Sequence, residues 1–131
     1  MSRVIHFEIP SSDPEKSIDF YKKIFGWEIN QWGDQPYWLC NTGNPSEPGI
    51  NGAIIEKRSP DHPVVNSIGV KNIQLAVETI EAAGGIIVVP VMAIKGVCWV
   101  AYFKDPDGNI IGVTQMDPNA KPESGVLSRE S

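Results

Sequence analysis

His6 and Glu8 are the two side chains whose types and spacing most directly suggest chemistry. They stand two residues apart in the alternating stretch from Val4 to Ile9, which predicts a half-buried strand. Residues two apart on a strand point to the same face, so the imidazole and the carboxylate would lie side by side. Such a pair can transfer protons or hydrogen-bond a polar ligand. The alternative is a structural histidine, satisfied by its neighbours, beside a carboxylate at the rim of the fold.

The bulk composition is that of one globular domain. The chain has 131 residues, of which 41% are apolar and 21% charged. A formal net charge of −5 and the lack of basic runs argue against a nucleic-acid partner. The start of the chain has no signal-peptide pattern, and no apolar run is long enough to span a bilayer. Cys40 and Cys98 therefore indicate reduced, buried thiols in a cytoplasmic protein without a membrane partner.

The order of predicted elements repeats once along the chain. In the first half, a strand over residues 4–9 precedes a helix that begins at Pro14, is capped by Ser12 or Asp13, and stops at Gly26. The remaining predicted elements are strands over residues 27–32, 36–42 and 50–57, then a strand over 64–70, a helix over 72–83, and strands over 86–89, 97–103 and 110–116. The sequence therefore predicts an α+β protein made of two βαβββ modules, with an offset of about 60 residues between matching positions. That offset pairs His6 with Ser67 and Gly52 with Gly112.

Three stretches carry a resemblance to a known family. They are the helix end Phe20–Trp27, its counterpart Glu81–Gly85, and the turn and strand Phe103–Gly112. With these motifs, the chain resembles the vicinal-oxygen-chelate superfamily of glyoxalase, bleomycin-resistance and dioxygenase proteins. Within that superfamily it is most similar to the branch of predicted lactoylglutathione-lyase-related proteins. The similarity extends over nearly the whole chain up to Met116.

The resemblance implies a fold and a division of the chain. In the glyoxalase/bleomycin resistance fold, two βαβββ modules form paired curved mixed sheets around a small-molecule cavity. The expected single domain covers residues 1–117, with modules at about 3–58 and 63–117, and residues 118–131 form a polar C-terminal tail. Bleomycin-resistance proteins form dimers with ligand sites between chains, so the resemblance also implies a homodimer.

The resemblance further assigns four metal-ligand positions to the first and last strands of each module. In this sequence they hold His6, Ser67, Gly52 and Gly112. Only His6 is a good ligand, and a closed metal shell needs three or four donors. We therefore expect no firmly held metal, with weak divalent binding as the alternative. The two glycines either enlarge the ligand cavity or mark an irregularity in the strands.

The family's phenylalanine at the position of Phe103 packs on the helices, which implies that the other face of this strand lines the cavity. Cys98 and Tyr102 lie on that other face, where the Tyr102 hydroxyl would donate a hydrogen bond to a ligand oxygen. Trp38, with Trp32 and Tyr37, is a candidate wall of the same cavity. The alternative for these aromatic residues is ordinary core packing.

Three functions stay open from the sequence. The first is a lactoylglutathione-lyase-related enzyme that lacks most metal ligands and transfers protons with His6, Glu8 or Tyr102. The second is a non-catalytic protein of the bleomycin-resistance type that binds or sequesters a small molecule. The third is a metal-dependent lyase or dioxygenase, which the missing ligands disfavour.

Overall fold

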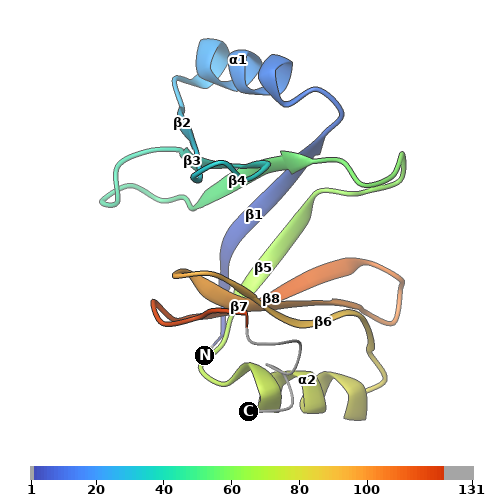
Figure 1. The fold of residues 1–131 in the computed structure, drawn as a ribbon. Coiled ribbons are helices and arrows are strands. Elements are labelled where there is room, and N and C mark those ends of the chain that lie inside the picture. The colour runs from blue at the N-terminus through green and yellow to red at the C-terminus, as the bar shows by residue number, and fades with distance from the viewer. Residues whose placement is uncertain (1, 123–131) are drawn as a thin grey trace. The chain divides into compact units, whose positions relative to one another are not determined.

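The computed structural model describes residues 2–122, so the part of the predicted polar tail beyond residue 122 lies outside the described residues. The described elements follow the order βαβββ twice (Figure 1), which confirms the predicted α+β class and the module repeat. The chain divides into two compact units, which we call module 1 (residues 5–66) and module 2 (residues 2–4 and 67–122). The expected cavity and the expected single domain stay predictions.

Module 1 contains a four-stranded mixed sheet and one helix. Its elements are β1 (Val4–Ser11), α1 (Pro14–Phe25), β2 (Glu28–Gln31), β3 (Tyr37–Asn41) and β4 (Asn51–Glu56). The strand order is β2-β3-β4-β1, in which β1 and β4 are parallel and the other neighbours are antiparallel. Because β1 and β4 run in the same direction, the chain must return to the starting edge of β1 before it enters β4. The helix α1 and the hairpin of β2 and β3 make this connection.

Module 2 repeats this topology. Its elements are β5 (Val65–Gly69), α2 (Ile73–Ala82), β6 (Ile86–Ile94), β7 (Cys98–Lys104) and β8 (Ile110–Met116), in the order β5-β8-β7-β6. β6 runs past Pro90, whereas the sequence predicts a strand that ends at Val89. The pairing with β7 shifts register on either side of Val89, and such irregularities accommodate a proline that cannot donate to the ladder.

The helix α1 begins and ends where the sequence predicts. The Asp13 carboxylate accepts a hydrogen bond from the backbone N–H of Lys16 at 3.3 Å, and Pro14 occupies the first turn. Gly26 adopts a left-handed conformation with φ of 71°, and its N–H donates to the carbonyl of Lys22. No helix within residues 2–122 is long and apolar enough to cross a membrane.

Each helix covers one face of its own sheet (Figure 1). In module 1, Ile18 and Tyr21 of α1 pack with Phe7 and Ile9 around the buried residue Ile54. In module 2, Trp99 and Phe103 pack with α2 residues around a second buried cluster, which is the packing expected for the Phe103 face. Because side chains alternate along a strand, His6 and Glu8 must lie on the face of β1 that is turned away from α1.

The Phe7 ring packs directly over Gly52, its partner on the parallel strand β4. A Cβ atom at Gly52 would come within 2.5 Å of three carbons of this ring, which also contacts Trp27. Only glycine therefore allows the ring its observed place. This close approach holds the first strand of module 1 against the last.

Gly52→Ala is expected to destabilise the protein by about 1–3 kcal/mol, since the added methyl group must displace a packed aromatic ring. The measurement is urea unfolding followed by circular dichroism. Gly43→Ala is the matched control, because a Cβ there meets no atom closer than 3.9 Å. Equal stability of the two variants would contradict this account of Gly52.

Candidate functional site

A hydrogen bond between His6 and Tyr37 is the centre of the candidate site. The distance from His6 Nε2 to the Tyr37 hydroxyl oxygen is 2.8 Å. The planes of the two rings differ by 6°, and their centroids are 6.4 Å apart. The contact joins β1 to β3, although β4 lies between these strands in the sheet.

A small residue on β4 makes this contact possible. His6 is the register partner of Asn51 on one side of β4, and Tyr37 is the partner of Ile55 on the other. Ala53 lies midway between Asn51 and Ile55, on the same face, and is fully buried. Between these two register positions, the residue of β4 on this face is therefore the small Ala53.

Glu8 stands next to this pair. It shares the face of His6 and is the register partner of Ala53. Glu8 is only 5% exposed, which is unusual for a residue with a carboxylate. Imidazole, phenol and carboxylate are thus placed together on the face of module 1 that α1 leaves uncovered.

Burial lowers the pKa of His6 below its ordinary value of 6.5. The cause is desolvation, which disfavours the charged imidazolium. His6 is therefore neutral at physiological pH. A neutral imidazole has one N–H donor and one nitrogen acceptor, so it can give or take a hydrogen bond in proton transfer.

Three of the other predicted site residues come together in module 2. Ser67, Gly112 and Tyr102 are register neighbours on β5, β8 and β7. A Cβ atom at Gly112 would overlap the hydroxyl of Ser67, which is 1% exposed, and would contact the Tyr102 ring. Cys98 lies further along β7 on the same face and is buried. Their predicted role in lining a cavity stays a prediction.

Gly52 and Trp38 lie apart from His6. As the partner of Phe7, Gly52 points toward α1, and Trp38 packs with the buried cluster beneath that helix. Since Ser67 pairs with Gly112 and His6 pairs with Asn51, the structural counterpart of Gly112 is Asn51. Gly52 is one residue away from this counterpart. A displacement of one residue moves a position to the opposite face of a strand, so Gly52 and Gly112 lie on different faces of their sheets.

Cys40 belongs to the same core as Trp38. Burial raises the pKa of its thiol to about 11, so the reactive thiolate is scarce at physiological pH. The sequence predicts inert packing for this residue, and its place between β2 and β4 agrees with that role.

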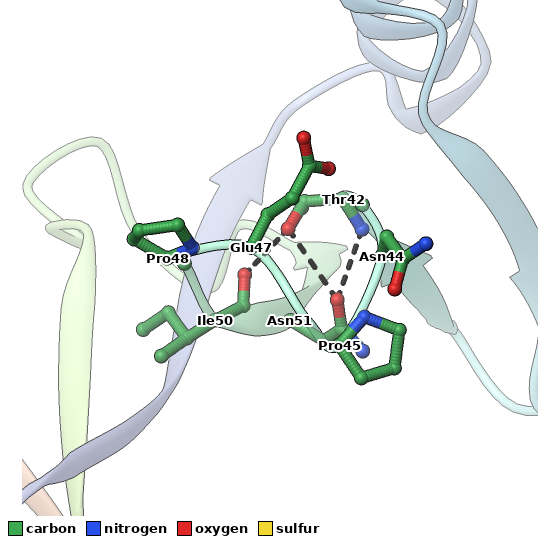
Figure 2. Close-up of a pocket in the computed structure, with 9 residues that line it drawn as sticks. Thr42, Asn44, Pro45, Glu47, Pro48, Ile50 and Asn51 are labelled. Atoms are coloured by element: carbon green, nitrogen blue, oxygen red, sulfur yellow. Dashed lines mark hydrogen bonds between the residues drawn. The ribbon is translucent and has the colours of Figure 1, made fainter.

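The loop between β3 and β4 surrounds a hollow of about 390 Å³. Figure 2 shows its polar groups bonded to each other: the Thr42 hydroxyl donates to the carbonyl of Ile50, and the Thr42 N–H donates to Asn51 Oδ1. The hollow is lined by Thr42, Gly43, Asn44, Pro45, Glu47, Pro48, Gly49, Ile50 and Asn51. None of the site residues predicted from the sequence is among them. The hollow therefore gives no support to the predicted cavity residues.

The donor set does not fit a tightly held divalent metal. Of the four ligand positions as the structure aligns them, His6 alone has a strong donor, because Ser67 and Asn51 are poor ligands and Gly112 has no side chain. Within residues 2–122, no group of three or more His, Cys, Asp or Glu side chains is arranged to hold a metal ion.

Comparison with known proteins identifies relatives over most of the chain. The sequence model of the Glyoxalase/Bleomycin resistance protein/Dioxygenase superfamily matches residues 3–113. Two curated relatives, each named probable lactoylglutathione lyase, come from Vibrio cholerae and Vibrio parahaemolyticus. They are 32% and 31% identical over an alignment of 126 positions, and each match covers 86% of this chain and 90% of the relative.

Solved structures show the same fold at lower identity. Methylmalonyl-CoA epimerase from Mycobacterium tuberculosis is 14% identical, with a TM-score of 0.64 over 88% of both chains. A glyoxalase/bleomycin resistance protein/dioxygenase superfamily member from Vibrio splendidus 12B01 is 18% identical, with a TM-score of 0.62 over 89% of this chain and 100% of that one. These similarities support the fold and say nothing of the reaction.

Acidification is expected to destabilise the protein through His6. Its folded pKa lies below 6.5, so the unfolded chain binds the proton first as the pH falls. The stabilising contribution is complete above pH 6.5 and is lost as the pH falls from there through the folded pKa. Urea unfolding at several pH values should show this loss in the wild type and a smaller loss in His6→Gln. A His6 resonance that titrates at or above 6.5 in the folded protein would contradict the expected shift.

Proposed function

The chain belongs to the Glyoxalase/Bleomycin resistance protein/Dioxygenase superfamily, and from this premise we propose that it is a glyoxalase-like enzyme that moves a proton on a small carbonyl compound. In this proposal His6 and Glu8 carry the reaction, and no resident metal takes part. The observation that carries it is the 2.8 Å hydrogen bond of His6 to Tyr37 beside the buried carboxylate of Glu8.

The reaction needs two groups on one face. One takes a proton from the carbon next to the carbonyl, and the bonding electron pair moves onto the carbonyl oxygen to form an enolate. The other donates a hydrogen bond to that oxygen as its negative charge develops. Returning the proton to the carbon restores the carbonyl compound. Two titratable side chains two residues apart on β1 fit these complementary roles.

The name of the curated relatives suggests the first class of compound to test. Lactoylglutathione is a thioester whose carbonyl stands next to a carbon that has a hydroxyl group and a hydrogen. A hydrogen in this position is the kind that a base can remove. We therefore propose 2-hydroxyacyl thioesters as the first substrates to examine.

A second candidate function is small-molecule binding without catalysis. The observation that favours it is the same hydrogen bond, because a buried histidine satisfied by a tyrosine also fits a purely structural role. A binding protein of the bleomycin-resistance type would retain ligand affinity when His6 is replaced. The homodimer, the cytoplasmic location and the ligand role of Tyr102 also stay predictions.

In heavy water, the wild-type protein is expected to incorporate deuterium at the carbon next to the carbonyl of S-lactoylglutathione. His6→Gln and Glu8→Gln should each lower this rate by at least about 100-fold, since each removes one group of the proton-transfer pair. Mass spectrometry of the recovered thioester measures the exchange.

His62→Gln is the matched control for this experiment. His62 is the other histidine of the chain, and its Nδ1 accepts a hydrogen bond from the backbone of Arg58 in an exposed loop. Its replacement should leave the exchange rate unchanged. Tight binding of the thioester with no exchange in the wild type would favour the binding protein instead.

Protein purified without a chelator is expected to contain much less than one equivalent of divalent metal, because one imidazole does not make a closed shell. Elemental analysis and calorimetric titration with nickel, zinc and manganese measure this. EDTA should leave deuterium exchange unaffected. Near-stoichiometric metal that is lost in His6→Ala would instead support the metal-dependent lyase or dioxygenase.

A further inference from the structure

We propose that the loop that connects β4 to β5 is a pH-sensitive clasp, which neutral His62 holds closed and protonated His62 opens. The loop lies between Glu56, where β4 ends, and Val65, where β5 begins (Figure 1). Its closing bond runs from the backbone N–H of Arg58 to Nδ1 of His62, at 3.1 Å. The clasp belongs to this loop alone and is independent of the proposed function.

The direction of the closing bond is fixed by its two partners. A backbone N–H can only donate, so Nδ1 of His62 must accept with its lone pair. A ring nitrogen that accepts carries no proton, and the neutral imidazole therefore has its proton on Nε2. Protonation of His62 places a second proton on Nδ1, where it faces the N–H of Arg58. Two donors cannot bond each other, so the closing bond is lost.

The charges around the ring act in the same direction as the closing bond. Burial of the ring lowers the pKa of His62 most, followed by the positive charges of Arg58 and Lys57. The pKa is lowered in spite of the neighbouring Asp61, whose carboxylate would raise it. The imidazolium would thus be a third positive charge in this short loop, and its repulsion by Arg58 favours the open form.

Other bonds of the loop do not involve the imidazole. The backbone N–H of His62 donates to the carbonyl of Ser59 at 3.1 Å, which closes a turn. Pro60 stands at the second position of this turn, where its fixed φ is favourable. The N–H of Lys57 donates to the carbonyl of Ser11 at 2.9 Å. Opening of the clasp therefore frees only the short segment between these two backbone bonds.

The clasp opens as the pH falls. The folded pKa of His62 lies below its ordinary value of 6.5, so the ring is neutral and the clasp closed at physiological pH. The stabilising contribution of the closing bond is complete above pH 6.5 and is lost as the pH falls from there through the folded pKa. Because the bond requires the neutral ring, it also helps to hold this pKa down by linkage.

Hydrogen exchange of the Arg58 amide, followed by NMR at several pH values, tests the clasp. Its protection factor, which is corrected for the intrinsic exchange rate at each pH, should fall about fivefold as His62 titrates, because one hydrogen bond is lost. The amides of Lys57 and His62 are internal controls, since their acceptors are backbone carbonyls, and they should keep their protection. Protection of the Arg58 amide that does not change with pH would overturn the proposal, as would a His62 ring protonated on Nδ1 at neutral pH.

Two replacements of His62 separate its acceptor from its charge. Oδ1 of an asparagine lies near the position of Nδ1 and accepts a hydrogen bond, but it takes up no proton in this pH range. His62→Asn should therefore keep the Arg58 amide protected from neutral to acid pH. His62→Phe keeps a ring without an acceptor and should leave that amide unprotected throughout. A pH response that persists in His62→Asn would contradict the clasp.

Two further variants test the surroundings of the ring. Lys57→Gln removes a positive charge and should raise the folded pKa of His62 toward 6.5, as should high salt, which screens the same charge. His6→Gln removes the other histidine and should leave the response of the Arg58 amide unchanged, whereas a lost response would assign the opening to His6 instead. Circular dichroism at each pH identifies global unfolding, in which the Lys57 amide would lose its protection as well.

Discussion

Packing of the Phe7 ring against Gly52 determines which face of β1 meets α1. A strand has two faces with strict alternation, so placing Phe7 and Ile9 under the helix turns His6 and Glu8 to the other side. The placement of His6 and Glu8 therefore depends on an apolar contact in which neither side chain takes part. The same contact explains why β4 has a glycine at a position where no left-handed backbone requires one.

The sequence predicts well those features that depend on a few adjacent residues. Asp13 followed by Pro14 specifies the start of α1, and Gly26 specifies its end, because capping and left-handed conformations are properties of single residues. The order of strands and helices follows from patterns of the same short range. The end of β6 was not predictable in this way. Pro90 normally ends a strand, and only the shifted pairing with β7 allows the strand to continue.

The candidate site was only partly predictable, because it depends on register and on contacts between distant residues. His6 and Glu8 share a face through local alternation, and the sequence alone indicates this. The choice of Gly52 as a match for Gly112 is displaced by one residue from the structural counterpart, Asn51. Both positions lie in one strand, and no local pattern distinguishes their faces. Tyr37 is visible as an aromatic residue, but its bond to His6 crosses β4 and joins residues 31 positions apart.

A neutral histidine suits this site better than a charged one, for a reason that concerns Glu8. An imidazolium next to a carboxylate stabilises the ionised form and so makes that carboxylate a weaker base. In the proposed function, an N–H of the neutral imidazole can still donate to an oxygen, and such a hydrogen bond strengthens as the oxygen becomes an enolate. Burial favours the neutral form of His6, since desolvation disfavours the charged imidazolium. In the proposed function, a neutral His6 beside Glu8 therefore avoids the strong stabilisation of the ionised carboxylate that an imidazolium would bring.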